Sequence, residues 1–300
     1  MPYLLLLLVA LFWSGNFIVA KGIQESIPPL SLSFWRWALA LLILIPFSAR
    51  SFLQQKNQMR DHWKIILLLG ILGIACFSTF IYIALLSTTV TNTVLVNATN
   101  PIFIVIFSWI GFKDRVSLVQ VAGIALSLGG LAWIITRGNP SFLMTLQFAR
   151  GDLWTLAAAV CWALYTVLLR QYPGRTDSLA FLAVLYTAGL IFLTPLYIWE
   201  SFNEFPIMLN TTSVSGTIYL GIFPSIFAFI FWNRGVKAVG ANRAGVFIYL
   251  IPVFSIVLAF LLFDESFKSY HPPGILLIGL GIFLTTYFGK RKPADLKQGH

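Results

Sequence analysis

The sequence predicts an all-α integral membrane protein with ten transmembrane helices, arranged as two inverted five-helix repeats. Three observations predict this fold: few charged residues, ten apolar runs long enough to cross a bilayer, and an internal repeat. Charged residues make up 10% of the 300 residues and apolar residues 58%, and the mean hydropathy is +0.86. A soluble domain usually carries about 25% charged residues, so the chain is placed among membrane proteins.

Ten apolar runs reach the length of a membrane span, which is roughly 20 residues. In chain order they cover about 4–20, 31–49, 65–86, 91–112, 117–136, 153–170, 178–199, 213–233, 244–263 and 272–289. The first run lacks the basic segment that opens a signal peptide, so it is interpreted as a span. Short polar turns, STTVTN and KAVGANR, separate the fourth and ninth runs from the runs before them.

Basic residues orient the spans. The loops after the even-numbered spans and the C-terminal tail hold 15 of the 20 basic residues: Arg50, Lys56, Arg60, Lys64, Lys113, Arg115, Arg170, Arg175, Arg234, Lys237, Arg243, Lys290, Arg291, Lys292 and Lys297. The positive-inside rule therefore predicts that both termini are cytoplasmic. Because the charge of +10 lies in loops between spans, no nucleic-acid partner is predicted.

The two halves of the chain repeat each other. WIGFKDRVSLVQVAGIALSLGG and FLLFDESFKSYHPPGILLIGLG align, and earlier segments align with a slightly shorter offset. Matched pairs are Trp13 and Trp162, Lys21 and Arg170, and Pro46 and Pro195 at an offset of 149, and Gly70 and Gly221, Pro101 and Pro252, and Gly123 and Gly274 at 151. The predicted repeats are 1–140 and 150–290, followed by a cytoplasmic tail, 291–300. Since five spans is an odd number, the second repeat enters the membrane from the opposite side.

Inverted repeats favour a transporter. Such repeats place a solute site near the membrane midplane and permit outward-open and inward-open arrangements. The alternative is a duplicated but static membrane protein. No HExxH, GxSxG or cluster of His, Cys and Asp lies within the spans, so neither an enzyme nor a metal site or cofactor is predicted. The loops contain no sizeable soluble domain that would indicate a receptor.

Aromatic and amide side chains on several spans are candidates for a solute cavity. Trp13 and Asn16 share one helix face because they are three residues apart, and Trp162 and Tyr165 repeat this arrangement in the second half. Tryptophans of the headgroup belt lie near the ends of a span, whereas Trp13 and Trp162 lie in mid-span. Asn97 and Asn100 also share a face, beside a proline; they either line the cavity or bind neighbouring helices. The other candidates are Ser78, Tyr82, Asn233 and Tyr249.

Charged residues near the spans have two interpretations each. Arg36 lies within the second span, where an ionisable group marks a functional site by default. It either faces a solute carboxylate or has a structural role, reaching the interface or pairing with Glu25. Asp264 and Glu265, like Asp114, are either helix-end charges or members of a gate with Lys21 or Lys268. Mid-span carboxylates and histidines are absent from the sequence, which favours facilitated diffusion or exchange over proton antiport.

Four segments together resemble the EamA family of the drug/metabolite transporter superfamily: FWSGNFIVAK, SFWRWALALL, ATNPIFIVIFSWIGFKDR and LIPVFSIVLAFLLFDESF. The family's acidic position after the fourth and ninth spans is kept here, as Asp114 and as Asp264 and Glu265, but its glycine is not. The resemblance covers nearly the whole chain. It implies a ten-span exporter of small metabolites in a plasma membrane or a bacterial inner membrane, with amino acids as one substrate class, including aromatic ones as in the YddG-like branch.

The predicted function is export of small metabolites, foremost amino acids, by alternating access through a central cavity. The alternatives are drugs, nucleosides or other neutral metabolites, and a nucleotide-sugar-type exchanger. The last would need several cations for phosphates, whereas Arg36 is the one basic residue well inside a span. The expected partners are a small-molecule solute and the lipid bilayer, and the sequence leaves monomer and homodimer open.

Overall fold

Ten helical spans make up the part of the chain that the structure, a computed structural model, describes: residues 1–114, 116–139, 149–176, 178–262 and 268–288. The predicted number of spans is confirmed. The first half contains α1 (Pro2–Ile23), α2 (Pro29–Asp61), α3 (Trp63–Leu69), η1 (Gly70–Cys76), α4 (Phe77–Ser87), α5 (Val90–Asn97), α6 (Asn100–Phe112) and α7 (Leu118–Ile135). The second contains α8 (Arg150–Leu168), η3 (Leu169–Gln171), α9 (Leu179–Asn203), α10 (Thr211–Leu220), η4 (Gly221–Phe227), α11 (Ala228–Val239), α12 (Ala241–Gly245), η5 (Val246–Tyr249), α13 (Leu250–Leu262), α14 (His271–Phe283) and η6 (Leu284–Phe288).

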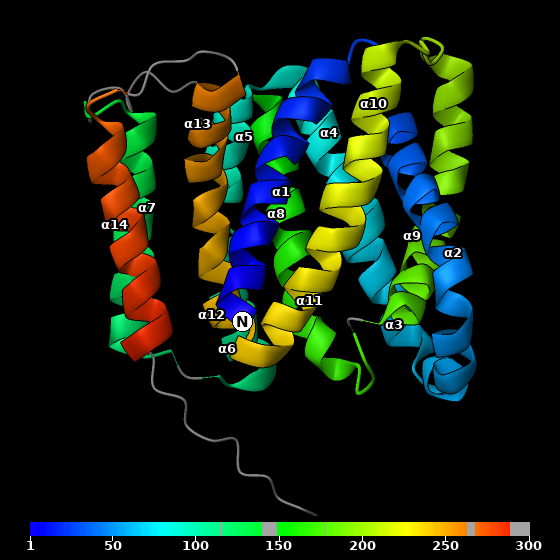
Figure 1. Cartoon of the computed structure of the whole chain (residues 1–300), viewed down its shortest axis with the longest axis horizontal. Helices are drawn as coiled ribbons and strands as arrows, with labels where there is room; N and C mark the ends of the chain where they lie inside the picture. The colour runs from blue at the N-terminus through cyan, green and yellow to red at the C-terminus, as the bar shows by residue number, and fades with distance from the viewer. Residues whose placement is uncertain (115, 140–148, 177, 263–267, 289–300) are drawn as a thin grey trace, which may run out of the picture.

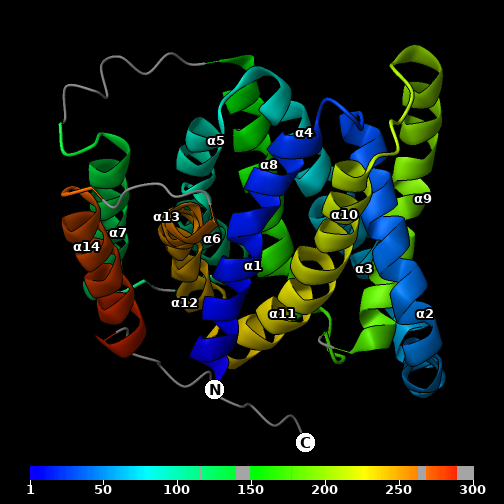
Figure 2. The ribbon, with the colours of Figure 1, turned by 45° about the horizontal axis from the view of Figure 1, so that its top comes forward.

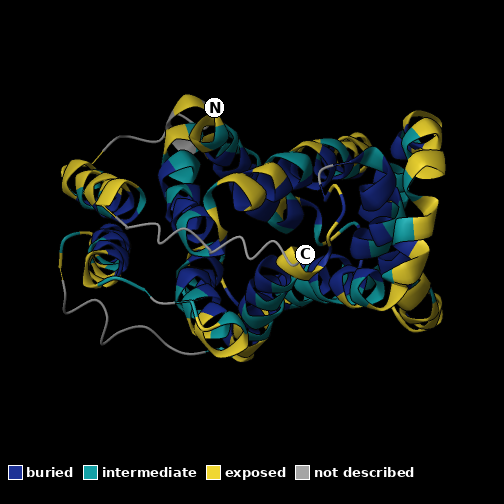
Figure 3. Cartoon of the chain, turned by 90° about the horizontal axis from the view of Figure 1, so that it is seen from below, coloured by how far each residue is buried: buried dark blue, intermediate teal, exposed yellow. Residues whose placement is uncertain are grey.

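The helices form one bundle with α1 and α8 in the middle. In Figures 1 and 2, α2 and α9 lie at one end of the bundle, and α7 and α14 lie together at the other. Figure 3 shows buried positions facing the interior and exposed positions facing outward. The largest fully buried side chains include Trp37, Trp162 and Trp232, and the outward positions include Leu42, Trp109 and other large apolar residues, which suits a surface covered by lipid.

One helix, α2, extends well beyond its predicted span. The second span was expected to end near residue 49, but α2 continues to Asp61 through SARSFLQQKNQMRD. The extension is polar, contains neither glycine nor proline, and consists mainly of residues that lose little side-chain entropy in a helix. An apolar run therefore marks the part of α2 that needs lipid, whereas the helix itself ends only where its backbone is interrupted, at His62.

Equivalent spans of the two halves are interrupted at equivalent places. The fourth span breaks between α5 and α6, one residue before Pro101, and the ninth passes through the 3₁₀ segment η5 just before Pro252. Proline has no backbone N–H group, so it is tolerated in the first turn of a helix, and each proline lies in the first turn of the helix that follows the interruption. The third and eighth spans each contain a π-helical segment, η1 and η4, at an offset of 151 residues. Such segments are often found at functional sites.

Glycines bring α7 and α14 into backbone contact. A Cβ on Gly123 would meet the carbonyl oxygen of Gly281, and a Cβ on Gly130 would meet the carbonyl oxygen of Gly274. Ser127 Oγ donates to the carbonyl oxygen of Ile278 at 3.3 Å across the same contact. Small residues allow such close approach between helices in lipid, so these residues join the last span of one half to the last span of the other.

The ends of α2 and α9 cap each other. Glu200, at the end of α9, accepts hydrogen bonds from the backbone N–H groups of Leu30 and Ser31, at 2.9 and 2.6 Å, and from Ser31 Oγ at 2.7 Å. Ser51 of α2 in turn accepts a 3.2 Å bond from the N–H of Ala180, at the start of α9. Ser51 and Glu200, like Ser31 and Ala180, differ by 149 residues. The pseudo-twofold axis therefore relates the two caps.

Replacement of Glu200 by alanine is expected to destabilise the bundle by about 1–3 kcal/mol. The change removes a charged cap from the first turn of α2, where the free N–H groups are buried and have no other acceptor of this kind. The free energy of unfolding from detergent titration measures the loss. Glu204→Ala, at an exposed position one turn later, should change it by less than about 0.5 kcal/mol; equal losses in both variants would disprove the capping role.

Candidate functional site

A small cavity lies between the two halves near the centre of the bundle. Its volume is about 20 Å³, which is room for about one water molecule. Residues of α1, α2, α5, α6 and α8 line it together with Phe77, Phe229, Ile248 and Ile251. Six of the residues selected from the sequence are among them: Trp13, Asn16, Arg36, Asn97, Asn100 and Trp162. The structure thus brings together side chains from spans that lie far apart in the chain.

Arg36 is the charged group of this cavity. It is 3% exposed, and its Nη1 donates to Asn16 Oδ1 at 2.8 Å and to the hydroxyl of Tyr82. Its Nε donates to Ser225 Oγ at 2.9 Å, and its guanidinium lies 4.6 Å from the ring centroid of Trp37. Each of these partners is neutral. Among the described residues Arg36 pairs with no carboxylate, so the alternative of a surface pair with Glu25 does not match its position.

The π-helical segment η4 supplies the partner of Arg36 from the second half. Ser225 Oγ donates to the carbonyl oxygen of Leu220 at 2.7 Å, five residues back. In a π-helix the same carbonyl oxygen also accepts a hydrogen bond from the backbone N–H group five residues later in the chain. The same segment presents the carbonyl oxygen of Pro224 to Trp13 Nε1 at 3.2 Å. The irregular backbone of η4 therefore faces other protein groups, as it must at membrane depth.

Indole rings form the apolar wall of the cavity. The rings of Trp13 and Trp162 meet edge to face, with centroids 4.9 Å apart, and Trp13 lies 5.2 Å from Trp232. Phe229 packs edge to face on Trp162 at 5.4 Å. Trp162 Nε1 is buried and has no hydrogen-bond partner among the described residues. A buried indole N–H usually finds a partner, so this donor is available to a bound solute.

The two asparagines of the fourth span flank its break. Asn97 ends α5 and Asn100 begins α6, and Asn100 Nδ2 donates to Asn97 Oδ1 at 3.0 Å. The two side chains thus partly satisfy each other, and both line the cavity. Asn100 Oδ1 is fully buried and accepts no hydrogen bond from any described residue. The cavity therefore holds an unused acceptor as well as unused donors.

The remaining candidates lie behind the cavity wall. Ser78 Oγ accepts from Trp37 Nε1 at 2.9 Å and so orients the ring beneath Arg36. Tyr249 is fully buried in η5, and its hydroxyl has no described partner. Asp264 and Glu265 fall outside the described residues. Asp114 pairs with Arg170 at 2.5 Å, whereas Lys21, its predicted gate partner, donates to the carbonyl oxygen of Leu85 at 2.6 Å.

A tyrosine–asparagine pair recurs in each half with the two residues exchanged. In the first half, Asn16 on α1 accepts from the hydroxyl of Tyr82 on α4 at 3.3 Å. In the second half, the hydroxyl of Tyr165 on α8 donates to Asn233 on α11 at 2.9 Å. Asn233 Nδ2 in turn donates a hydrogen bond to the carbonyl oxygen of Thr176 at 2.8 Å. The two pairs occupy equivalent positions on opposite sides of the central cavity.

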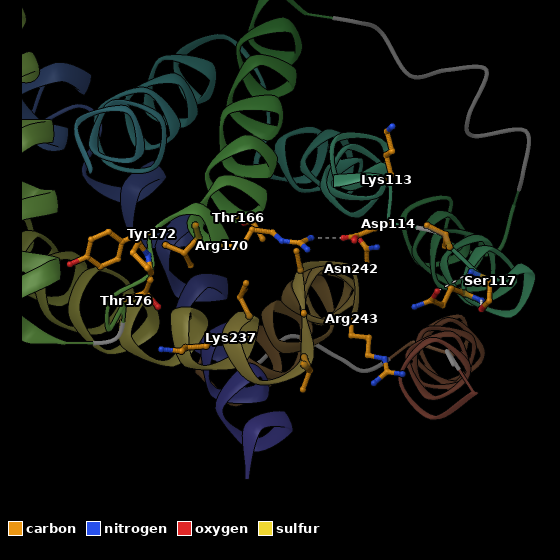
Figure 4. A pocket seen from close by; sticks show the side chains of 18 of the residues that line it. Lys113, Asp114, Ser117, Thr166, Arg170, Tyr172, Thr176, Lys237, Asn242 and Arg243 are labelled. Carbon is orange, nitrogen blue, oxygen red and sulfur yellow. Dashed lines mark hydrogen bonds and ion pairs between the residues drawn. The ribbon is translucent and has the colours of Figure 1, made fainter. Parts of the chain in front are cut away.

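A much larger cavity, here called the vestibule, opens on the face of the bundle where the N-terminus lies (Figure 4). It has a volume of about 980 Å³ and lies between the ends of α6, α8 and α11 and the start of α12. Lys113, Asp114, Thr166, Arg170, Thr176 and Lys237 are among its lining residues. Tyr172 also lines it, and burial raises the pKa of this tyrosine. The phenol therefore stays protonated and remains a hydrogen-bond donor near neutral pH.

The opposite face has a closed counterpart, here called the distal pocket, of about 10 Å³. Its residues match vestibule residues at the repeat offsets: Ala20 with Leu169, Gln24 with Pro173, Ile27 with Thr176, Leu85 with Val236, and Leu86 with Lys237. The same positions of the two repeats thus enclose an open cavity on one face and a closed one on the other. Between the vestibule and the central cavity lies the pair formed by Tyr165 and Asn233.

Some residues of the site were not selected from the sequence. Ser225 and Phe229 follow a proline in an otherwise apolar eighth span, and Trp37 directly follows Arg36. The signal available was the charge of Arg36, which required polar partners somewhere in the membrane. The internal repeat gave no indication that Ser225 belongs to the site, because the equivalent residue, 151 positions earlier, is the apolar Ile74.

Comparisons with known proteins agree with this architecture. The sequence pattern of the EamA-like transporter family matches residues 1–136 and again 149–287. "Uncharacterized transporter YyaM" of Bacillus subtilis is 29% identical over 286 residues, which cover 93% of this chain and 92% of that protein. An "Uncharacterized transporter" of Archaeoglobus fulgidus is 28% identical over 286 residues, covering 95% of this chain and 96% of that one.

Two further comparisons bear on substrate and fold. The "Probable terminal-alkyne amino-acid exporter" of Streptantibioticus cattleyicolor is 28% identical over 192 residues, 63% of this chain and 60% of that protein. One protein of known crystal structure superposes with a TM-score of 0.75 at 22% identity, covering 96% of this chain and 97% of that one. The superposition shows the fold alone.

Tyr165→Phe and Asn233→Ala are expected to be coupled. Each single change leaves a buried polar group of the other residue, or of Thr176, without a partner, and should cost about 1–3 kcal/mol of unfolding free energy. The double variant should lose less than the sum by about 0.5–1.5 kcal/mol. Detergent titration of the four proteins measures the difference.

The control cycle combines Asn233→Ala with Tyr219→Phe. The hydroxyl of Tyr219 donates to the carbonyl oxygen of Phe12, so it shares no hydrogen-bond partner with Asn233. These two changes should add within about 0.5 kcal/mol. Additive losses in both cycles would show that the pair between Tyr165 and Asn233 does not form.

Proposed function

We propose a substrate and a mechanism for this chain, which belongs to the EamA-like transporter family and is a multi-pass membrane transporter. The substrate is an amino acid, and aromatic amino acids suit the cavity best. The solute crosses by alternating access through the central cavity. Relatives of the chain are named as transporters, and the amino-acid exporter among them supports the substrate class.

The observation that carries the proposal is the buried charge of Arg36. A guanidinium keeps its proton in proteins, and a buried charge is costly unless it is paired. Here the hydrogen bonds come from the neutral groups of Asn16, Tyr82 and Ser225. A solute carboxylate would supply the missing negative charge, and Trp162 Nε1, which lines the same cavity without a partner, would supply a further donor.

The rest of the cavity suits the remaining groups of an amino acid. Asn100 Oδ1 is a buried acceptor without a partner, and a solute ammonium group is a donor that would satisfy it. The rings of Trp13, Trp162 and Phe229 offer apolar faces to a flat side chain. The present volume of about 20 Å³ is far smaller than an amino acid, so the aromatic rings must separate when solute is bound.

Alternating access is supported by the two unequal cavities at equivalent positions. The vestibule is open at about 980 Å³, whereas the distal pocket is closed at about 10 Å³. Exchange of the two conformations between the repeats would close the first and open the second. The excess of basic residues on the face with the N-terminus favours a cytoplasmic location for that face. The vestibule would then receive solute from the cytoplasm, and net transport would be export whenever the cytoplasmic concentration of solute is the higher one.

Arg36→Gln is expected to lower the efflux of L-phenylalanine from proteoliposomes about 10- to 100-fold, because the carboxylate loses a charged donor. The ratio of L-phenylalanine to L-phenylalaninamide efflux is the sharper measurement, since the amide lacks the carboxylate. Wild type should prefer the acid, and the variant should have little preference. Arg60→Gln, an exposed position on the same helix, is the matched control. An unchanged ratio in Arg36→Gln would refute recognition of the carboxylate.

Asn100→Leu and Asn97→Leu test the ammonium side of the cavity. Each should lower the efflux of L-phenylalanine at normal membrane abundance, with the stronger effect at Asn100, because its Oδ1 is the unused acceptor. The preference for L-phenylalanine over 3-phenylpropanoate should fall in parallel. Asn203→Leu, at an exposed end of α9, is the control. Unchanged efflux in both cavity variants would assign these amides a structural role only.

Transport is expected to be independent of the proton gradient. Among the described residues, no aspartate, glutamate or histidine lines the central cavity, and the mid-spans carry none in the sequence. Proton-coupled carriers usually place such a group in the membrane. Efflux of L-phenylalanine should therefore keep its rate when an ionophore collapses the pH gradient. Complete loss of efflux would contradict the uncoupled mechanism.

A further inference from the structure

We propose that the vestibule contains a second solute site, which binds the carboxylate of the solute on Lys237 and Arg170 before the solute reaches Arg36. The inference rests on the proposed function, because the same solute must pass both sites. It differs in its location, about the ends of α8 and α11, and in its ligand, an exposed carboxylate rather than a whole amino acid. Figure 4 shows Arg170 on the α8 side of the vestibule and Lys237 on the α11 side.

Both cations project from the walls of an open cavity. Lys237 is exposed in the last turn of α11 and makes no hydrogen bond or ion pair with another described residue. Arg170 is 43% exposed, and its guanidinium lies 4.0 Å from the ring centroid of Phe112. The ring holds the guanidinium at the wall without neutralising its charge. Lys113 and Arg243 line the same cavity, so positive charge predominates there.

Unpartnered hydroxyl groups lie in the same cavity. Thr166 is fully buried and Thr176 is 4% exposed, and the Oγ1 atoms of both lack a hydrogen-bond partner among the described residues. The hydroxyl of Tyr172 is in the same condition. Buried polar groups in proteins are nearly always hydrogen-bonded. The hydroxyl of Tyr172 points away from Lys237 and Arg170 in Figure 4, so the hydroxyl groups of Thr166 and Thr176 are the unused donors suited to a carboxylate.

The distal pocket shows that Lys237 is not demanded by the repeat architecture. The position equivalent to Lys237 is Leu86, and both line their respective cavities. Thr176 is likewise matched by Ile27, which has no hydroxyl group. Orientation by the positive-inside rule needs basic residues near the membrane surface, and exposed residues such as Lys56 satisfy it outside the vestibule. Lys237 and the hydroxyl of Thr176 are therefore properties of one cavity only. Arg170 does have a basic equivalent, Lys21, but Lys21 donates to the carbonyl oxygen of Leu85 and is not a lining residue of the distal pocket.

Asp114 holds Arg170 in place when no solute is bound. The two side chains form an ion pair in which Asp114 is 34% exposed. Exposed ion pairs contribute little to stability, so an incoming carboxylate can replace Asp114 as the partner of Arg170. The pair joins the end of α6 in the first repeat to η3 in the second. Exchange of its partner would therefore weaken one link between the repeats at the mouth of the vestibule.

The site would act on the rate and not on the equilibrium of transport. A focused positive potential raises the local concentration of an anionic group and its rate of association. The concentration for half-maximal transport should consequently be lower for solute added at the vestibule face than for solute added at the other face. An uncoupled carrier must still reach equal concentrations on both sides, so the lower half-saturation concentration at the vestibule face is accompanied by a proportionally lower maximal rate from that face.

The test exchanges equivalent residues between the two cavities. Lys237→Leu should raise the half-saturation concentration of L-phenylalanine at the vestibule face about three- to tenfold and reduce its dependence on ionic strength. Leu86→Lys should lower the half-saturation concentration at the opposite face. Lys56→Leu, an exposed lysine on the same face but outside the vestibule, should change neither. Equal effects of Lys237→Leu and Lys56→Leu would overturn the proposal, since surface charge alone would explain them.

A binding measurement separates this site from the central one. Succinate, compared with uncharged succinamide at constant ionic strength, should raise the melting temperature of wild type, Arg36→Gln and Lys56→Leu in detergent, but not that of Lys237→Leu. Equal stabilisation of all four proteins, or of none, would overturn the vestibule site. Stabilisation in this pattern without efflux of any amino acid would keep the vestibule site and reject the proposed substrate.

Discussion

The rest of the site depends on the burial of one positive charge, that of Arg36, at the junction of the two repeats. Moving a guanidinium group out of water costs roughly several kcal/mol, even after the surrounding protein has relaxed. Arg36 offsets part of this cost with Asn16 and Tyr82 from its own repeat and Ser225 from the other. The face of Trp37 adds a cation–π contact. Because these groups stand on four different spans, the charge fixes how α1, α2, α4 and η4 meet.

The polar groups of the candidate site lie where the two repeats differ. The duplicated framework supplies the breaks, the π-helical segments and the reciprocal caps in both halves. The polar groups of the cavity do not follow the repeat. The positions equivalent to Arg36, Asn97 and Asn100 are Leu185, Ile248 and Ile251. One half thus carries the charged and amide groups, and the other contributes chiefly rings and a backbone that can accept hydrogen bonds.

The sequence predicted the parts of the site that repeat and missed those that depend on backbone detail. Trp13 and Trp162 were selected because they are equivalent and lie in mid-span, and their rings indeed meet at the cavity. Ser225 was missed because a π-helical segment cannot be inferred from hydropathy, which responds to burial and not to the hydrogen-bond register. Glu200 was missed because its partners lie 169 and 170 residues away in the chain. The vestibule lies in loops and helix ends, where spacing carries no information about depth.

The contacts between helices indicate where the bundle would bend in the proposed alternating-access mechanism. α7 and α14 touch through glycine backbones, with no space for sliding, and α2 and α9 are tied by caps at both ends. The vestibule and the distal pocket are lined by the ends of α11 and α4 respectively, and each of these helices directly follows a π-helical segment, η4 or η1. Closing one cavity while opening the other requires α4 and α11 to move relative to the fixed pairs. A π-helical segment allows this at the least cost, because its hydrogen bonds are already out of α-helical register. We therefore expect η1 and η4 to be the two hinges. Because Arg36 donates a hydrogen bond to Ser225 of η4, bending at η4 would change the position of a partner of Arg36.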